Sequence, residues 1–229
     1  MGGNGDTEYR FTGAVVADNV FTDIGRSQPT TRTLSWYIDI IDNDDAELRG
    51  NLLVNQPDLG NSRGIFLSGG SNRGIAVRDN FVHGLRRRHL QVEALSAWSS
   101  ILVDANTFVG NTADECLISH AGGFSNVTYS GNAYRSAAAP GAWFCVDGAR
   151  RDLAGWTAAS SESSAATADP TTPEPTRNLD SYAVQLGLGG TLADFARAAR
   201  TQSRHTFRPE LMAVNANNYI REGFGRPLR

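Results

Sequence analysis

VRDNFVHG, residues 77–84, is a short β-type run interrupted by an asparagine, and the same pattern returns along the chain. Its other copies are VVADNVFTD (15–23), ELRGNLLVN (47–55), VDANTFVGN (103–111) and TYSGNAYRS (128–136). The asparagines of the five copies are separated by 32, 29, 26 and 26 residues: Asn19, Asn51, Asn80, Asn106 and Asn132. A drifting period of this length predicts a repeat protein whose loops vary in length.

One repeat divides into three short strands. In the third copy these are GIFLSG (64–69), GIAVRD (74–79) and FVH (81–83), and apolar residues alternate with polar ones along them. The repeat is too short for a βαβ unit and contains no helical period. A β-sandwich would also space its strands evenly, but it would not place an asparagine at the same point of every third strand. The sequence therefore predicts an all-β solenoid of about five rungs, one rung for each copy.

The side chain of the recurring asparagine explains why it returns. Asparagine tolerates a left-handed backbone, and its amide can hydrogen-bond to the same residue about 4.8 Å away on the next rung. Residues 9–148, with this expected ladder, resemble the right-handed parallel β-helix of the pectate-lyase-like superfamily. In that fold an asparagine ladder marks the turn between the second and third strands. The resemblance is specific for the fold and says less about function.

The C-terminal part of the chain has a different composition. Residues 149–190 are expected to form a strap or linker, since 157–178 reads TAASSESSAATADPTTPEPTRN and is rich in Ser, Thr, Ala and Pro. Two helices are predicted after it, at 191–202 and 208–224. This tail is similar to C-terminal extensions of bacterial secreted β-helix proteins. The similarity implies that residues 191–224 pack on the β-helix or cap it.

Composition narrows the possible classes of protein. The net charge of −3 and the pI near 5.8 argue against a nucleic-acid surface. No stretch approaches the roughly 20 apolar residues of a membrane span. The chain has no lysine, because all 21 basic residues are arginine, so lysine chemistry is excluded. The opening MGGNGDTEYRF lacks the regions of a signal peptide, whereas the family resemblance implies an extracellular or periplasmic protein.

The two cysteines and the N-terminal end leave questions open. Cys116 and Cys145 are about one repeat apart, so they could lie on neighbouring rungs and form a disulfide, or remain two buried thiols. No CxxC motif or Cys/His cluster suggests zinc. The repeat is already running by Phe11, and an open solenoid end exposes unpaired strand edges and core. We therefore expect upstream rungs of a longer protein, or another chain, to cover the N-terminal end.

In carbohydrate enzymes with this fold, the substrate groove runs along the first strand of each rung, and the loops after the third strand form its walls. The resemblance places the outward residues of the first strands in such a groove. The candidate catalytic residues are Arg88, His89, Glu93, Glu115 and His120. The candidate substrate-binding residues are Asp39, Ser68, Gln91, Ser119, Asp147, Trp98 and Trp143.

Cleavage of a uronate polymer by β-elimination needs a charge on the substrate carboxylate to be neutralised and a proton to be moved. Ca²⁺ held by some of the four carboxylates Asp39, Glu93, Glu115 and Asp147 could neutralise that charge. An arginine or a histidine of the catalytic set could move the proton. Hydrolysis would instead pair Glu93 with Glu115 as acid and base. The competing interpretation is that these charges only solvate an outward strand face.

Two hypotheses follow for function. The first is a carbohydrate-active enzyme, lyase-like or glycosidase-like, or a fragment of one, acting on an acidic polysaccharide. The run Arg86–Arg88 favours an anionic polymer as its partner. The second is a non-catalytic β-helix module for glycan binding, adhesion or surface structure. Neither hypothesis involves nucleic acid or a membrane.

Overall fold

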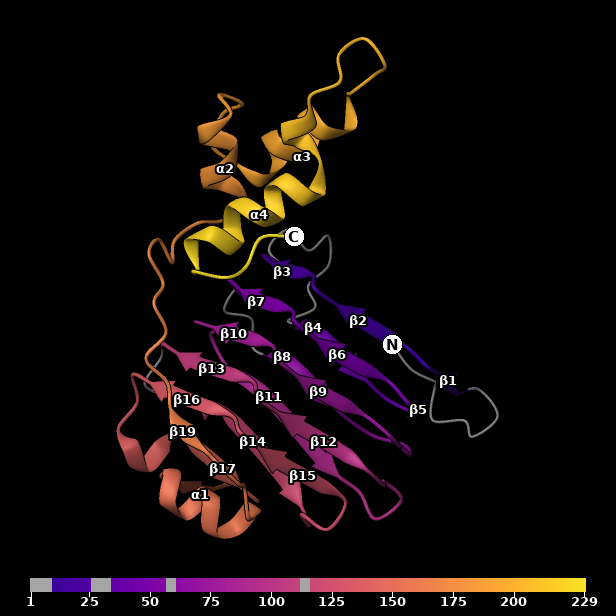
Figure 1. The fold of residues 1–229 in the computed structure, drawn as a ribbon, viewed down its shortest axis with the longest axis vertical. Helices are drawn as coiled ribbons and strands as arrows, with labels where there is room; N and C mark the ends of the chain where they lie inside the picture. Colours follow the sequence, from indigo (N-terminus) through magenta and orange to yellow (C-terminus); the bar gives the residue numbers. More distant parts are fainter. Residues whose placement is uncertain (1–9, 26–33, 57–60, 112–115) are drawn as a thin grey trace. The chain divides into compact units, whose positions relative to one another are not determined.

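The structure is a computed structural model that describes residues 10–25, 34–56, 61–111 and 116–229. The chain divides into two compact units, Met1–Ala168 and Asp169–Arg229, and each is described by itself. The first unit is a parallel β-solenoid of about 4 turns, which confirms the predicted fold class (Figure 1). No helix in the described residues is long and apolar enough to cross a membrane.

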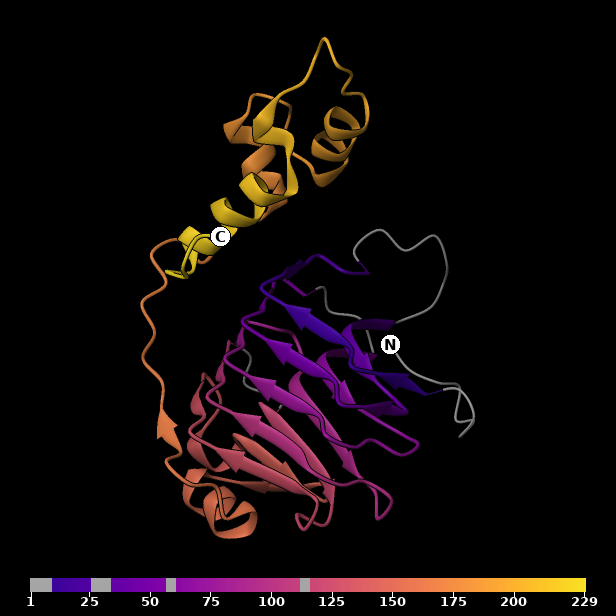
Figure 2. The same ribbon diagram turned by 45° about the vertical axis from the view of Figure 1, so that its right-hand side comes forward.

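Three parallel sheets run along the coil, and each turn contributes one strand to every sheet (Figure 2). The first sheet contains β4 (Leu34–Ile40), β8 (Asn61–Leu67), β11 (Arg88–Ala94), β14 (Ile118–Gly122) and β17 (Phe144–Val146), with β18 (Ala149–Arg151) antiparallel at its end. The second sheet contains β2 (Val15–Ala17), β6 (Glu47–Arg49), β9 (Ala76–Arg78), β12 (Ile101–Asp104) and β15 (Val127–Ser130). The third sheet contains β3 (Val20–Thr22), β7 (Leu52–Val54), β10 (Phe81–His83), β13 (Thr107–Gly110), β16 (Ala133–Ser136) and β19 (Ala166–Thr167). A short pair, β1 (Phe11–Thr12) and β5 (Asn43–Asp44), forms a separate ribbon.

The predicted asparagine ladder is present between the second and third sheets. The Nδ2 of each asparagine donates to the Oδ1 of the next, at 3.2 Å from Asn19 to Asn51 and at 2.9 Å in each of the following three steps to Asn80, Asn106 and Asn132. The backbone N–H of each donor residue bonds to the same oxygen. Asn51, Asn80, Asn106 and Asn132 are buried, and these hydrogen bonds remove the cost of hiding their amides from water.

The left-handed backbone lies one residue before the position that the sequence suggested. It occurs at the residue that precedes each asparagine, with φ between 52° and 62°: Asp18, Gly50, Asp79, Ala105 and Gly131. The asparagine itself needs its N–H for the ladder, so the preceding residue makes the bend. Aspartate tolerates this conformation at Asp18 and Asp79, whereas it is strained for the alanine at Ala105.

Apolar side chains of the first sheet fill the inside of the coil in register. One column joins Ile38, Ile65, Leu90, Ile118 and Phe144 through neighbouring strand pairs. All five are buried. Truncating a side chain in such a column to alanine removes about 2–5 kcal/mol of stability. From this column onward along each strand, alternation turns Asp39, Phe66, Gln91 and Ser119 outward.

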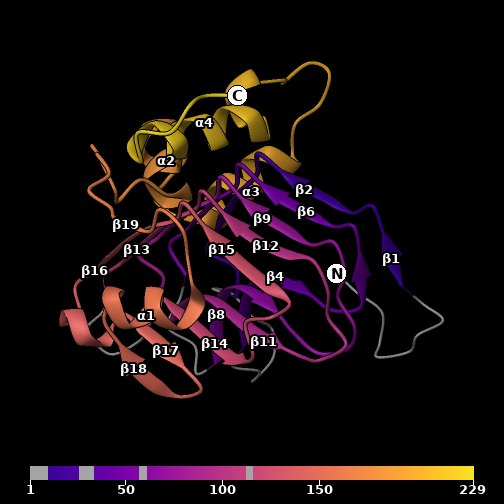
Figure 3. The ribbon, with the colours of Figure 1, turned by 60° about the horizontal axis from the view of Figure 1, so that its bottom comes forward.

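The last turn is covered by a helix that the sequence analysis did not anticipate. Helix α1 (Leu153–Ser160) packs against β17 and β18, within the segment expected as a strap (Figure 3). The Asp152 carboxylate caps it by accepting from the Gly155 N–H at 2.7 Å. Its Trp156 is fully buried and stacks on Phe144 with ring centroids 4.9 Å apart. One turn of 3₁₀ helix, η1 (Pro140–Ala142), precedes β17.

The ladder ends on a buried carboxylate in the same region. The Oε1 of Glu162 accepts from the backbone N–H of Asn132 at 3.1 Å and from its Nδ2 at 2.7 Å. The Oε2 accepts from Tyr134 Oη at 2.8 Å and from Trp156 Nε1 at 2.6 Å. Glu162 thus takes the place of a sixth rung amide and also anchors the segment that follows α1.

The second unit is helical. It contains α2 (Leu179–Gln185), α3 (Leu192–Arg200), a 3₁₀ turn η2 (Pro209–Leu211) and α4 (Ala213–Gly223). Helices α3 and α4 fall within the two predicted helices, whereas α2 was not anticipated. Tyr182 of α2 stacks on Tyr219 of α4 with ring centroids 4.8 Å apart, which joins these two helices.

Candidate functional site

The outward face of the first sheet carries a compact group of aromatic and charged side chains. Trp36 of β4 and Phe66 of β8 meet edge to face, with ring centroids 5.6 Å apart. The Arg63 guanidinium carbon lies 4.8 Å from the Phe66 centroid and 5.6 Å from that of Trp36. The two rings hold the guanidinium by cation–π attraction and limit its freedom.

A second arginine lies beside the first. Arg63 and Arg88 are register partners on β8 and β11, and both donate to the Oε1 of Gln91, at 2.5 Å and 2.8 Å. The Nε2 of Gln91 donates in turn to Glu93 Oε1 at 3.2 Å. We call Trp36, Arg63, Phe66, Arg88, Gln91 and Glu93 the outer-face cluster. Its centre is one neutral oxygen between two cations, an arrangement that suits an anionic ligand.

Asp39 lies next to this cluster, opposite Phe66 in the register. Its Oδ1 accepts a hydrogen bond from Ser68 Oγ at 2.8 Å. Burial raises the pKa of the Asp39 carboxyl, because the charged form is poorly solvated there. A carboxyl group with a raised pKa can donate a proton at a higher pH than an ordinary aspartate.

The two histidines proposed as catalytic bases are buried, so the expectation that they are partly exposed on this face is wrong. His120 is 1 % exposed and pairs with Val92 on the inward side of the sheet. The sequence predicted His120 on the outward face of the first sheet. In the structure β14 continues to Gly122, and the alternation of the strand turns His120 inward. Its Nδ1 lies 2.9 Å from Tyr129 Oη, and burial lowers its pKa.

His89 is 2 % exposed and occupies the corner between the first and third sheets. Its Nε2 lies 2.9 Å from the backbone oxygen of Val109, at the end of β13. A Cβ at Gly110 would lie 3.6 Å from the imidazole, an ordinary packing contact, but only 2.6 Å from Leu117 Cδ2, so the glycine leaves room for that leucine beside the ring. Burial lowers the pKa of His89 to about 4. The imidazole is therefore neutral at pH 7 and packed away from the face.

The remaining candidates are scattered. Trp98 is 2 % exposed, and its Nε1 lies 3.2 Å from the oxygens of both Gly69 and Gly70, so it packs in the core and does not face solvent. Trp143 is half-buried and donates to the Ala138 oxygen at 3.0 Å.

Three further candidates complete the set. Ser119 is half-buried on the outward face beside Gln91. Asp147 is exposed at the end of β17 and accepts from the Gly122 N–H at 2.8 Å. Glu115 lies outside the described residues. Of the residues predicted, Arg88, Gln91, Glu93, Asp39, Ser68 and Ser119 therefore lie on one face or at its edge.

The sequence left two alternatives for the cysteines, a disulfide or two buried thiols, and the structure contains the disulfide. Cys116 and Cys145 are bonded, with Cα atoms 5.8 Å apart. Cys145 pairs in register with Ser119, so the disulfide joins neighbouring turns beside the outward face. Within the described ranges, no group of three or more His, Cys, Asp or Glu residues could hold a metal ion.

Sequence reasoning missed Arg63, the cation at the centre of the cluster. The signal that could have found it is its spacing from Arg88, which is one short repeat of 25 residues. Trp36 contributes an aromatic ring to the same cluster. Its Nε1 is buried and has no hydrogen-bond partner in the described part of the chain, so the indole keeps a donor available inside the cluster.

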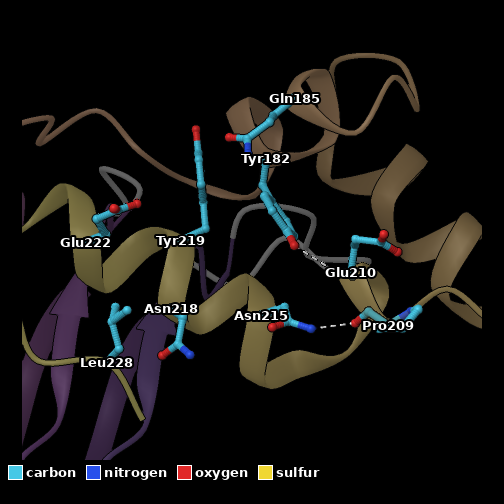
Figure 4. Close-up of a pocket in the computed structure, with 9 residues that line it drawn as sticks. All are labelled: Tyr182, Gln185, Pro209, Glu210, Asn215, Asn218, Tyr219, Glu222 and Leu228. Atoms are coloured by element: carbon cyan, nitrogen blue, oxygen red, sulfur yellow. Dashed lines mark hydrogen bonds between the residues drawn. The ribbon is translucent and has the colours of Figure 1, made fainter.

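The helical unit has a hollow of its own, with a volume of about 340 Å³ (Figure 4). Its polar groups largely bond to one another: Tyr182 Oη donates to the Glu210 oxygen and Asn215 Nδ2 to the Pro209 oxygen, both at 2.7 Å. Asn218 exchanges two hydrogen bonds with Arg229. A hollow whose polar groups are already paired is a weaker candidate than the outer-face cluster.

No family model, curated protein or solved structure matches the chain. Function therefore has to be inferred from the geometry of the site itself.

Proposed function

We propose that this protein binds an acidic polysaccharide along the outward face of the first sheet. The observation that carries the proposal is the pair Arg63 and Arg88, which share one oxygen of Gln91. A guanidinium presents its donors in a planar fork that matches a carboxylate. Trp36 beside them offers an aromatic edge and a buried N–H donor.

A regular polymer suits this face because the face is itself regular. Strand neighbours repeat about every 4.8 Å, so side chains on successive turns can meet successive units of one chain. The parallel β-helix with its asparagine ladder supports our assignment to the pectate-lyase-like superfamily, whose members act on such polymers. The disulfide Cys116–Cys145 supports an extracellular or periplasmic location, since disulfides persist in oxidising compartments.

Binding is better supported than turnover, because both histidines considered as bases are buried. Cleavage by a polysaccharide lyase or glycoside hydrolase remains the second candidate. The observation that favours it is Asp39, whose raised pKa would let it act as a general acid.

The test is electrophoresis of the purified chain through gels that contain polygalacturonate, alginate or neutral dextran. We expect retardation by an acidic polymer and none by dextran, with weaker retardation at higher salt. The substitution Arg88→Gln should weaken binding about tenfold, the loss of one charge-assisted contact. Arg200→Gln, which makes the same charge change at an exposed site on α3, is the control.

Two results would refute binding: no retardation by either acidic polymer at low salt, or equal retardation of the Arg88→Gln and Arg200→Gln variants. Ultraviolet absorbance of unsaturated products and release of reducing ends, followed in the same mixtures, test the second candidate. Cleavage that is lost in Asp39→Asn would support an enzyme, and no product from either polymer would leave binding alone.

A further inference from the structure

A polar pocket of about 360 Å³ lies where the turns after the third-sheet strands meet the start of the first sheet. Its walls come from three successive turns of the coil: Asn55 and Gln56 follow β7, Gly84 and Arg86 follow β10, and Asn111 follows β13. The pocket is large enough for a ligand of monosaccharide size.

One wall of this pocket contains the buried side chain of Gln56. The residue is 3 % exposed, and its Nε2 donates to the backbone oxygens of Ser35 and Arg63. The two carbonyl acceptors fix which end of the amide carries the nitrogen. The Oε1 is buried and has no hydrogen-bond partner among the described residues. Buried side-chain oxygens are rarely left without a donor, so this one points to a ligand that supplies a hydroxyl.

The other walls supply complementary groups. Arg86 and Asn111 are exposed and make no hydrogen bond or ion pair in the part of the chain that the structure describes. Gly84 adopts φ +63°, and a Cβ there would lie 2.9 Å from Asn111 Nδ2. The glycine therefore permits the turn and keeps the space beside Asn111 open. Together the walls offer guanidinium donors, an amide with both functions and a buried acceptor.

We infer that the pocket holds one carboxylated sugar unit, with the carboxylate on Arg86 and a hydroxyl on Gln56 Oε1. The inference rests on the proposed function for the class of ligand, and it identifies a subsite at the side of the face that binds the polymer. The pocket adjoins the outer-face cluster in two ways. Gln56 is bonded to the backbone of Arg63, and Arg86 is two residues from Arg88.

The experiment is a titration of the ¹⁵N-labelled chain with galacturonate and glucuronate, followed by the signals of the Asn111 side chain and the Gly84 amide. Galactose and acetate are the matched probes, because the first keeps the hydroxyls without the charge and the second keeps the charge without the hydroxyls. We expect saturable shifts with a uronate and binding about tenfold weaker for either control. Arg86→Gln should remove the preference for the uronate over galactose, and Arg200→Gln should keep it.

The outcomes separate this inference from the proposed function. If polymer gels retard the chain but the uronates shift neither signal, the pocket inference is overturned and the proposed function stands. Equal shifts from acetate and a uronate also overturn it, since the site would then bind any anion. If a uronate binds in the pocket while neither polymer is retained, the pocket stands as a sugar-acid site and the proposed polymer face is refuted.

Discussion

Replacing Glu162 by glutamine tests how the ladder is terminated. The carboxylate is 7 % exposed and receives four hydrogen bonds, two from Asn132 and one each from Tyr134 and Trp156. No ion pair joins it to an arginine within the described ranges. Every neighbour that bonds to its oxygens is thus a donor, and Glu162→Gln places an NH₂ group against one pair of them.

The magnitude follows from the geometry. The least costly arrangement keeps an oxygen on Asn132 and turns the amide nitrogen toward Tyr134 and Trp156. The tyrosine hydroxyl can rotate to accept, but the indole N–H cannot, so at least one charge-assisted bond worth about 1.5–3 kcal/mol is lost. The bonds to Asn132 also weaken, because neutral acceptors are about half as strong. Removing the desolvated charge offsets part of this loss. We expect a net destabilisation of about 2–3 kcal/mol.

The assay is urea unfolding at pH 7 followed by tryptophan fluorescence. All four tryptophans lie in the β-helix unit, so the signal reports on that unit alone. The control is Asp79→Asn, which makes the same acid-to-amide change at an exposed turn of the same unit and should stay within about 0.5 kcal/mol. A Glu162→Gln variant that unfolds within about 0.5 kcal/mol of the wild type would refute the reasoning.

Two further predictions concern the buried imidazoles and the strained turns. Burial holds the pKa of His89 near 4 in the folded state, below its unfolded value of about 6.5. Burial of the neutral imidazole therefore carries no protonation cost above pH 6.5, and the free energy of unfolding decreases as the pH falls toward 4. Between pH 7 and 4.5 the loss should be on the order of 2–3 kcal/mol, and a His89→Gln variant measured at both pH values should lack it. An equal loss in both proteins would contradict this origin. Ala105→Gly should stabilise the protein by about 0.5–1 kcal/mol, because φ is 52° there and the equivalent residues Gly50 and Gly131 are glycines. Thermal unfolding measures this change, with Ala76→Gly in β9 as the control, which should destabilise the protein by a similar amount. A lower melting temperature for Ala105→Gly would show that backbone strain at Ala105 does not limit stability.

The fold could be predicted because the ladder imposes a chemical requirement at a fixed place in each turn. Asn51, Asn80 and Asn106 each need a partner at one rung spacing, so their recurrence identifies both the strand that turns and the stacking. Helix α1 has no such recurrence. It occurs once, in a segment rich in Ser and Ala, and is held by the burial of Trp156, which sequence alone does not reveal.

The candidate site was predicted less well, because the face on which a strand residue lies depends on where the strand ends. The first strands were identified correctly, and Gln91, Glu93 and Ser119 share a face or its edge. His120 was expected on the outward face, but it lies within β14, which runs to Gly122, and alternation along that strand places it beside Val92 inside the coil. His89 sits at a corner, where alternation no longer decides the direction of a side chain.

The internal ladder also explains how an outward site can form on turns of unequal length. The longest and shortest repeats differ by six residues, yet Arg63 and Arg88 meet as register partners. A slip of one residue in a strand would move its outward side chains into the core, and the asparagine column resists that slip, since each amide bonds to one partner above and one below. The differences in length are taken up in the turns after the third strands, where Gln56 and Arg86 line the polar pocket. The ladder thus keeps the strand faces constant while the turns can vary in length. A binding surface with a fixed face and an adaptable edge requires this combination.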